Sequence, residues 1–170
     1  MKRTLFSIAA ILCASFIFSS CSKDVNSPDN GDAQALTSVF TLKSSDWAAE
    51  SGGFSATFDI SEITASITDQ GAVWIYYSFN NGTSYELAPA LSRTDQAGNS
   101  FDLLAEGGTD DQGGYALLTA LSYNGNTSAK PNFSPALLVK VVSIPSSLVQ
   151  AHPNVNKANY NEVKSVFRLK

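Results

Sequence analysis

The sequence predicts an all-β fold, an antiparallel β-sandwich with one or two short helices, including a C-terminal helix. Gly, Ser, Thr, Asn and aromatic residues are plentiful, whereas charged residues make up only 15% of the chain. Segments of alternating apolar and polar residues recur, and clusters of turn residues separate them, which is typical of sandwiches. Residues 36–170 have the length of one domain and can bury a sizeable core.

The first strands are predicted by alternation of period two, in which every second side chain points to the same face of a sheet. These strands cover residues 36–42, 54–60 and 73–79. The residues expected to face inward are Leu36, Phe40 and Leu42 in the first strand, Phe54, Ala56, Phe58 and Ile60 in the second, and Val73, Ile75, Tyr77 and Phe79 in the third.

The remaining strands follow from turn residues and from further alternation. Residues 80–83 (NNGT) indicate a hairpin, because Asn and Gly tolerate a positive φ, and the next strand is expected at residues 84–87. Residues 101–105, 115–123 and 136–144 complete the set. The glycine-rich segment 107–114 is expected to be a turn.

A short helix is expected in the middle of the chain. Ile60, Ile63 and Ile67 fall at helical spacing, and Asp59 with Glu62 can form a capping box at its start. Gly71 would end this helix, because glycine is favoured just past the last turn.

A second helix is expected at the C-terminus. Asn159 and Glu162 can form a second capping box at its start. Tyr160, Val163 and Phe167 then form one apolar stripe. The basic residues that follow favour the C-terminal end of the helix dipole; they are Lys164, Arg168 and Lys170.

The N-terminal segment has the layout of a secretory signal peptide. Lys2 and Arg3 form a short basic start, residues 5–18 are mostly apolar, and small residues precede Cys21, so residues 1–20 are expected to be removed. The apolar run is shorter than the roughly 20 residues that a membrane-spanning helix needs, which makes a transmembrane anchor the weaker alternative. Another alternative is a plain secretory signal followed by an incidental cysteine.

The segment FSSC at residues 18–21 resembles the processing site of bacterial lipoproteins. The resemblance implies that Cys21 receives a lipid and becomes the first residue of the mature protein. Ser22, Lys23 and Asp24 resemble the acidic export tag of Bacteroidetes-type surface lipoproteins. We therefore expect a lipid-anchored outer-membrane protein that faces the cell surface. Residues 21–35 form a flexible tether in this interpretation, because they are too polar to bury apolar surface.

The charge and cysteine content exclude several classes of function. Without Lys2 and Arg3, nine of the 11 basic residues remain against 15 acidic ones. Binding to nucleic acid is therefore not expected, because phosphate contacts need clustered Lys and Arg. Cys21 is the single cysteine after residue 20, so lipidation would leave neither a disulfide nor a thiolate metal site.

Candidate catalytic residues are few. His152 is the sole histidine and stands in a loop-like context, so we expect an exposed side chain and neither a catalytic triad nor a histidine metal site. Asp110 and Asp111 are typical of a turn, and calcium would need more oxygen ligands. Glycoside hydrolysis needs two facing carboxylates, and no spacing singles out a pair among Asp69, Glu86, Asp95, Asp102 and Glu106.

Three aromatic residues are candidates for a ligand platform. Trp74 and Tyr76 share the face of their strand opposite to Val73 and Ile75, and Trp47 stands in or beside a loop. Exposed aromatic faces can stack on sugar rings. Because a central sandwich strand usually has both faces covered, we expect Trp74 and Tyr76 to be structural.

A second resemblance covers most of residues 36–170. It rests on the strand, helix, glycine and strand of residues 58–77, on YELAP at residues 85–89, on VVSIP at residues 141–145, and on NYNEVKSVF at residues 159–167. Together these segments look like small uncharacterised Bacteroidetes-type surface lipoproteins with a compact β-sandwich domain. The resemblance offers no agreed activity and no catalytic residues to carry over. We expect neither a metal nor a cofactor.

The function expected from these observations is that of a non-catalytic surface module for adhesion, assembly or partner binding. Its contacts would be the membrane, through the N-terminal lipid, and a protein or glycan partner. The alternative is a carbohydrate-active protein, either a glycan-binding module or a weak hydrolase. A pilus-type assembly subunit would need an unpaired terminal strand, and the expected C-terminal helix argues against that.

Overall fold

The computed structural model describes residues 33–123 and 128–170. They belong to one compact unit, Gly31–Lys170. The signal peptide predicted at residues 1–20 lies outside the described residues, as do Cys21, Ser22, Lys23 and Asp24. Of the tether predicted at residues 21–35, the last three residues are described.

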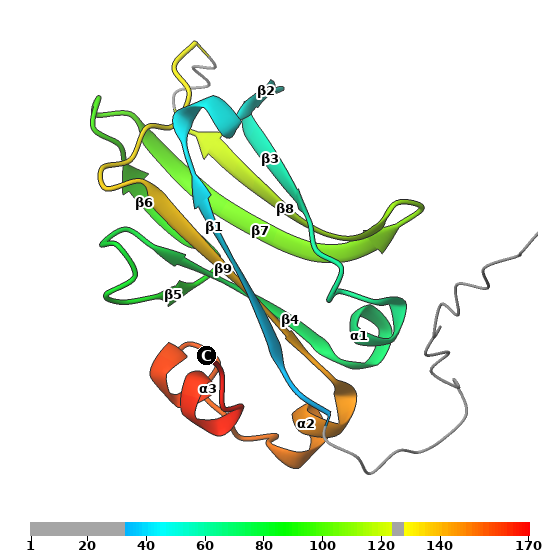
Figure 1. Ribbon diagram of the computed structural model, residues 1–170. Helices are drawn as coiled ribbons and strands as arrows, with labels where there is room; N and C mark the ends of the chain where they lie inside the picture. The colour runs from blue at the N-terminus through cyan, green and yellow to red at the C-terminus, as the bar shows by residue number, and fades with distance from the viewer. Residues whose placement is uncertain (1–32, 124–127) are drawn as a thin grey trace, which may run out of the picture. The chain divides into compact units, whose positions relative to one another are not determined.

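Two antiparallel sheets confirm the predicted all-β sandwich (Figure 1). The first sheet has four strands in the order β1 (Leu36–Leu42), β9 (Leu137–Ile144), β4 (Ala72–Ser78) and β5 (Glu86–Leu87). The second sheet has five strands in the order β2 (Ala48–Glu50), β3 (Gly53–Asp59), β8 (Gly113–Ser122), β7 (Ser100–Asp110) and β6 (Ala90–Thr94).

The main core lies between the two sheets. It includes the predicted inward residues Phe54, Ile75 and Tyr77, all of them buried. The Tyr77 hydroxyl donates a hydrogen bond to the Leu104 carbonyl at 2.7 Å, and this bond ties β4 to β7 across the sandwich. The prediction for Leu36 is wrong: its side chain is exposed, because it stands at the end of an edge strand.

A second core covers the other face of the first sheet. The chain after β9 forms α2 (Ser146–Ala151) and α3 (Tyr160–Val166), which lie beside this sheet (Figure 1). Tyr76 and Val142 from the sheet pack against Tyr160, Val163 and Phe167 from the C-terminal segment. This segment confirms the predicted C-terminal helix, and the side chain of its N-cap Asn159 accepts a hydrogen bond from the Glu162 amide.

The helix expected from Ile60 starts later in the chain. The structure has α1 at Ala65–Gln70, with Thr64 as its N-cap and Gly71 as its C-cap. The capping box predicted for Asp59 is wrong, because Asp59 is the last residue of β3. Ile60 instead donates its amide to the Gly114 carbonyl at 2.7 Å, so that both Ile60 and the nearby Ile63 are buried in the main core.

The glycine-rich segment 107–114 is mostly strand, which corrects the expected turn. β7 continues to Asp110 and β8 begins at Gly113, so two residues remain between the strands. The glycines are needed for close packing: a Cβ at Gly107 would lie 2.5 Å from Val73 Cγ1, and one at Gly114 would lie 2.0 Å from the Ile63 carbonyl oxygen. Real Cβ contacts are not that short, so neither position accepts a larger residue without a shift.

Several short elements were not expected from the sequence. They are the 3₁₀ helix η1 (Ser44–Asp46), β2, β6 and α2. No side chain caps the start of α2, where Pro145 is the N-cap, so the usual capping signal is absent there. In β6 the register shifts between Ala90 and Arg93, and Ser92 has a φ of 56°, which interrupts the alternation.

Candidate functional site

The candidate site is centred on Lys140, a lysine buried in the middle of β9. In the two ladders of this strand it stands opposite Val39 of β1 and Tyr76 of β4. Its side chain points to the second core and is only 8% exposed. The other buried residues of β9 are apolar or Ser143, so Lys140 brings the one buried positive charge into the described part of the chain.

Aromatic groups surround the Lys140 ammonium group. Nζ donates a hydrogen bond to the Tyr160 hydroxyl at 2.7 Å. It also lies 4.3 Å from the ring centroid of Tyr85 and 4.6 Å from that of Tyr160, within range of cation–π attraction. Among the residues that the structure describes, no carboxylate forms an ion pair with Lys140. The buried charge is therefore compensated by rings and one hydroxyl.

Beside Lys140 lies a pocket of ≈ 290 Å³, which we call the Lys140 pocket. Its lining comes from the β4–β5 loop, from β9 and from the segment that leads into α3, and consists of Gly82, Thr83, Ser84, Tyr85, Lys140, Ala158, Asn159, Tyr160, Asn161 and Lys164. Burial raises the pKa of Tyr160, and the nearby charge of Lys164 partly opposes this. The pocket thus combines two lysines, two tyrosine phenols, two aliphatic hydroxyls and two amides.

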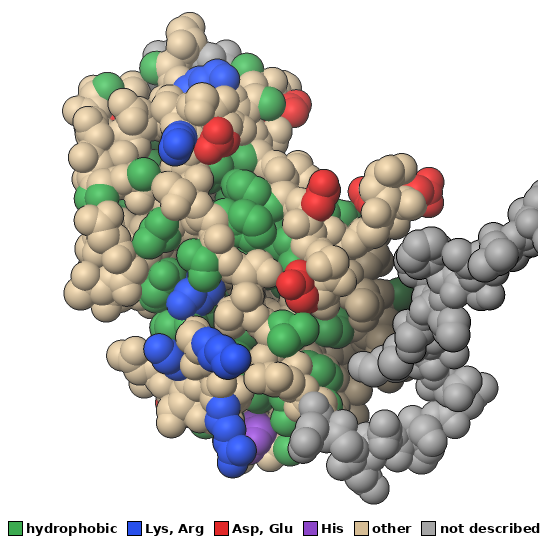
Figure 2. Space-filling model, viewed as in Figure 1, with side chains coloured by type: hydrophobic (Ala, Val, Ile, Leu, Met, Phe, Trp, Pro, Cys, Tyr) green, Lys and Arg blue, Asp and Glu red, His purple; other side chains and the backbone are tan. Residues whose placement is uncertain are grey.

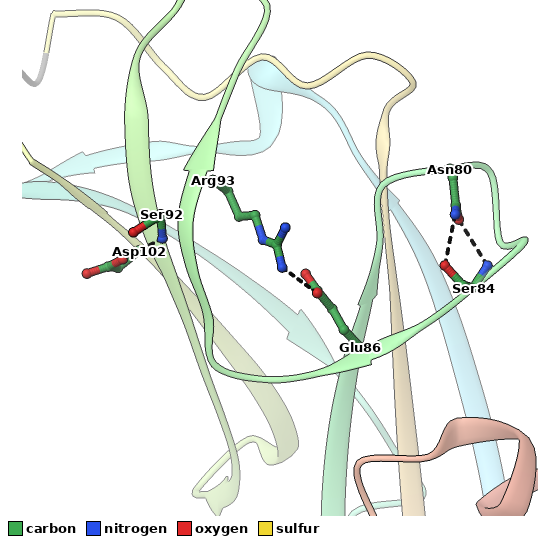
Figure 3. A network of polar contacts seen from close by, with 6 residues as sticks. All are labelled: Asn80, Ser84, Glu86, Ser92, Arg93 and Asp102. Atoms are coloured by element: carbon green, nitrogen blue, oxygen red, sulfur yellow. Dashed lines mark hydrogen bonds and ion pairs between the residues drawn. The ribbon is translucent and has the colours of Figure 1, made fainter.

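Hydrogen bonds hold one wall of the Lys140 pocket in place. In the loop between β4 and β5, Asn80 donates from Nδ2 to Ser84 Oγ at 2.8 Å and accepts from the Ser84 amide at 3.0 Å (Figure 3). Ser78 Oγ accepts from the Gly82 amide at 2.9 Å. Asn81 and Gly82 have positive φ, which confirms the predicted hairpin. It also confirms that Asn and Gly occur there because they tolerate a positive φ.

The opposite wall is held by the start of α3. Asn159 Oδ1 accepts from the Glu162 amide at 3.3 Å. The Glu162 side chain does not complete the predicted capping box and instead accepts from the Asn156 amide at 3.0 Å. Residues on both sides of the pocket are therefore hydrogen-bonded within the fold.

The charge around the pocket differs from that of the rest of the domain. Residues 140–170 contain one acidic residue, Glu162, and five basic ones, which are Lys140, Lys157, Lys164, Arg168 and Lys170. Residues 33–139 have the opposite balance, with 11 acidic residues against three basic ones. Figure 2 shows Lys and Arg side chains gathered where α3 lies in Figure 1. The C-terminal segment of an otherwise acidic domain therefore carries an excess of basic residues.

The three aromatic platform candidates do not form one exposed surface. Trp47 is 2% exposed and belongs to the main core. Tyr76 is fully buried in the second core, where its hydroxyl donates to the Lys157 carbonyl at 2.8 Å. Trp74 is half-buried, and its ring lies edge-on to Phe167 with 5.8 Å between centroids. The structural role expected for Trp74 and Tyr76 agrees with this packing.

A second hollow, of ≈ 360 Å³, lies beside Trp74. Its lining includes His152 and Phe167, whose rings meet edge-on at 5.6 Å between centroids. His152 is exposed, as predicted, and forms the C-cap of α2. Residues 156 and 157 line this hollow and residues 158 and 159 line the Lys140 pocket, so a single stretch of chain separates the two.

Several of the candidate carboxylates have structural partners. Asp95 is buried and accepts from the Asn99 amide at 2.8 Å. Asp102 accepts from the Tyr123 hydroxyl at 2.6 Å and from the Ser92 amide at 2.9 Å, and these bonds lower its pKa. Glu86 forms an ion pair with Arg93 (Figure 3).

The paired aspartates also act locally. Asp110 Oδ1 accepts from the amides of Gln112 and Gly113, at 2.8 Å and 3.1 Å, which agrees with the turn expected there. Within residues 33–123 and 128–170, no three His, Cys, Asp or Glu side chains come together as metal ligands. The Lys140 pocket is a polar cluster whose lining contains no carboxylate.

Buried tyrosines make the stability of the domain sensitive to alkaline pH. Burial raises the pKa values of Tyr76, Tyr77 and Tyr160, whereas in the unfolded chain these groups titrate near about 10. The unfolded state then loses protons first, so the contribution of these tyrosines to the free energy of unfolding should be constant below pH ~10 and fall above it. Thermal melts across this range, with tyrosinate absorbance as the second signal, test this. Tyr77→Phe should weaken the dependence, and a Tm that stays level well above pH ~10 would contradict it.

No helix in the described segments has the length and apolar character needed to cross a membrane. Comparison with known proteins gives no match to a family model, to a curated protein or to a solved structure.

Proposed function

We propose that the protein is a lipid-anchored, surface-exposed, non-catalytic binding module. The observation that carries this proposal is the sequence FSSC at residues 18–21, which ends a basic and then apolar segment and is followed by polar residues up to β1. A lipid on Cys21 would hold the domain at the membrane. The polar stretch would let the domain project from it.

The destination proposed is the outer membrane, with the domain facing outward. Ser22, Lys23 and Asp24 support this part of the proposal, because an acidic residue shortly after the lipidated cysteine is the feature of the export tag that they resemble. Digestion of intact cells with a protease tests it. Cleavage of the domain without lysis is the expected result, and protection until lysis would contradict outward exposure.

A binding role is supported by the polar side chains of the domain. Asp95, Asp102 and Glu86 are engaged in bonds within the fold. The Lys140 pocket contains cations, hydroxyls and amides and no carboxylate. General acid–base chemistry in glycoside hydrolysis depends on a pair of carboxylates, so this lining favours binding over hydrolysis.

Replacing Cys21 by Ala is expected to move the protein from the membrane fraction to the soluble fraction, because the thiol that would carry the lipid is gone. Fractionation of cells followed by a high-salt wash is the measurement. Cys13→Ala is the matched control, since Cys13 lies inside the segment that is expected to be removed, and it should leave the distribution unchanged. A Cys21→Ala protein that stays with washed membranes would refute the lipid anchor.

A carbohydrate-active protein is the second candidate, and the hollow beside Trp74 favours it. A half-buried indole, an exposed histidine and a lysine lie around this hollow, which is a combination of an apolar ring with polar groups that can hold a sugar. A glycan-binding module would be compatible with a surface anchor. Release of reducing sugar from a polysaccharide would be the sign of a hydrolase.

A further inference from the structure

We propose that the Lys140 pocket binds the carboxylate of an acidic saccharide, one sugar ring of which it accommodates. The inference rests on the proposed binding function and adds the class of ligand. It starts from the position of Lys140, which places a positive charge in a buried strand and has no carboxylate partner among the described residues. Burying a charge is costly unless it is paired and hydrogen-bonded.

The Lys140 ammonium group has hydrogen-bonding capacity to spare. It carries three N–H donors, and the bond recorded for it within the described residues is the one to the Tyr160 hydroxyl. Lys164, which is exposed, adds a second positive charge to the same pocket. An anion bound in the pocket would add a negative charge beside both lysines and would accept hydrogen bonds from their ammonium groups.

The rest of the lining favours a sugar over a bare anion. Thr83, Ser84, Asn159 and Asn161 supply hydroxyls and amides, which can both donate to and accept from the hydroxyls of a saccharide. A volume of ≈ 290 Å³ is at the small end for a ligand site and suits a single ring.

The same dimensions disfavour an acidic peptide. The lining comes from the β4–β5 loop, from Lys140 of β9 and from residues 158–164, and it encloses ≈ 290 Å³. An extended peptide backbone would need a longer groove.

Preorganisation strengthens the proposal. The bonds of Asn80 with Ser84 fix one wall, and the bonds around Asn159 fix the other. A ligand would therefore bind without the entropic cost of ordering these loops. The excess of basic residues in 140–170 would also attract an acidic polymer over a distance of about 8–10 Å at physiological salt.

The test compares ligands that differ only in charge. The full chain, purified in detergent, is titrated calorimetrically with an oligogalacturonate and with the same oligosaccharide after methyl esterification. We expect saturable binding of the acidic form, at least tenfold weaker binding of the ester, and a loss of affinity as salt is raised.

Variants then assign the binding to the pocket. Lys164→Gln removes one charge at an exposed position and should weaken binding about tenfold, because a charge-assisted hydrogen bond to the carboxylate is lost. Lys130→Gln removes an exposed lysine elsewhere in the chain and should leave affinity unchanged. Lys140→Met keeps the apolar stem and should abolish binding. If this variant does not fold, Lys164→Gln still decides the question.

Four results would overturn the inference. They are equal affinity for the acid and its ester, wild-type affinity in Lys164→Gln, competition by inorganic sulfate as effective as the sugar acid, and tighter binding of an oligoglutamate peptide. Each of them leaves the Cys21→Ala fractionation untouched. Membrane retention that depends on Cys21 without uronate binding would refute the ligand assignment alone, and uronate binding without such retention would refute the anchor alone.

Discussion

Trp47→Ala should lower the free energy of unfolding by about 3–5 kcal/mol, because it leaves a large cavity in the main core. Trp47 follows η1 directly and is 2% exposed. A loss of this size is a large fraction of the about 5–15 kcal/mol that stabilises a typical domain. Urea denaturation followed by far-UV circular dichroism is suited to the measurement, since it does not depend on the fluorophore that is removed.

The matched control is Leu91→Ala. Leu91 is an apolar residue with 56% of its surface exposed, so truncating it should change stability by less than about 0.5 kcal/mol. A Trp47→Ala protein that is as stable as the Leu91→Ala protein would show that Trp47 is not packed. That result would restore Trp47 as a candidate for ligand contact.

Gly114→Ala should destabilise the domain by about 3 kcal/mol or more and could prevent folding, because the added methyl group has no space. A Cβ at this position would lie 2.0 Å from the Ile63 carbonyl oxygen and 2.4 Å from the Ile60 carbonyl oxygen. Both are backbone atoms, which cannot move aside as the end of a side chain can. The measurement is the midpoint of urea unfolding, or the yield of folded protein where no transition is seen.

A substitution at the neighbouring Gly113 distinguishes the cost of a steric clash from the cost of backbone strain. Gly113 has a φ of 130° with nothing within 4 Å of an added Cβ, so Gly113→Ala measures the cost of the backbone conformation alone. That cost should be about 1–3 kcal/mol. Equal losses for the two variants would refute the close approach of Ile60 and Ile63 to Gly114.

The sandwich could be predicted because its strands follow local rules. In β4, period-two alternation placed Ile75 and Tyr77 on one face and Trp74 and Tyr76 on the other, and both faces are covered in the structure. The hairpin after this strand was predictable because Asn81 and Gly82 are suited to positive φ. Both the backbone preference and the side-chain alternation depend only on residues that are close together in the sequence.

The errors arose where distant contacts decide the conformation. The helical spacing of Ile60 and Ile63 suggested a helix, but the amide of Ile60 bonds to Gly114 in β8, far along the chain. The glycines at 107 and 114 looked like turn residues, whereas they serve the close packing of β7 and β8 against their neighbours. Composition alone does not distinguish a glycine that is needed for a turn from a glycine that is needed for close packing.

The Lys140 pocket was not predicted for the same reason. Its parts come from the β4–β5 loop, from β9 and from the start of α3, and tertiary contacts bring Tyr85 and Tyr160 to Lys140. One signal was present in the sequence: a single lysine interrupts the apolar segment LLVKVV at residues 137–142. A charge inside a strand that is buried on both faces needs compensation, and it therefore points to a polar site.

The pairing of β1 with β9 has a mechanical consequence. Seven successive residue pairs join the two strands, from Leu36 opposite Ser143 to Leu42 opposite Leu137. Tension applied at Leu36 along the strand axis would load all of these pairs together, in shear. Tension applied across the axis would instead open the pairs one at a time, starting at Leu36. Val39 stands opposite Lys140, so this ladder joins β1 directly to the strand that carries Lys140. The domain is thereby expected to resist force best along β1.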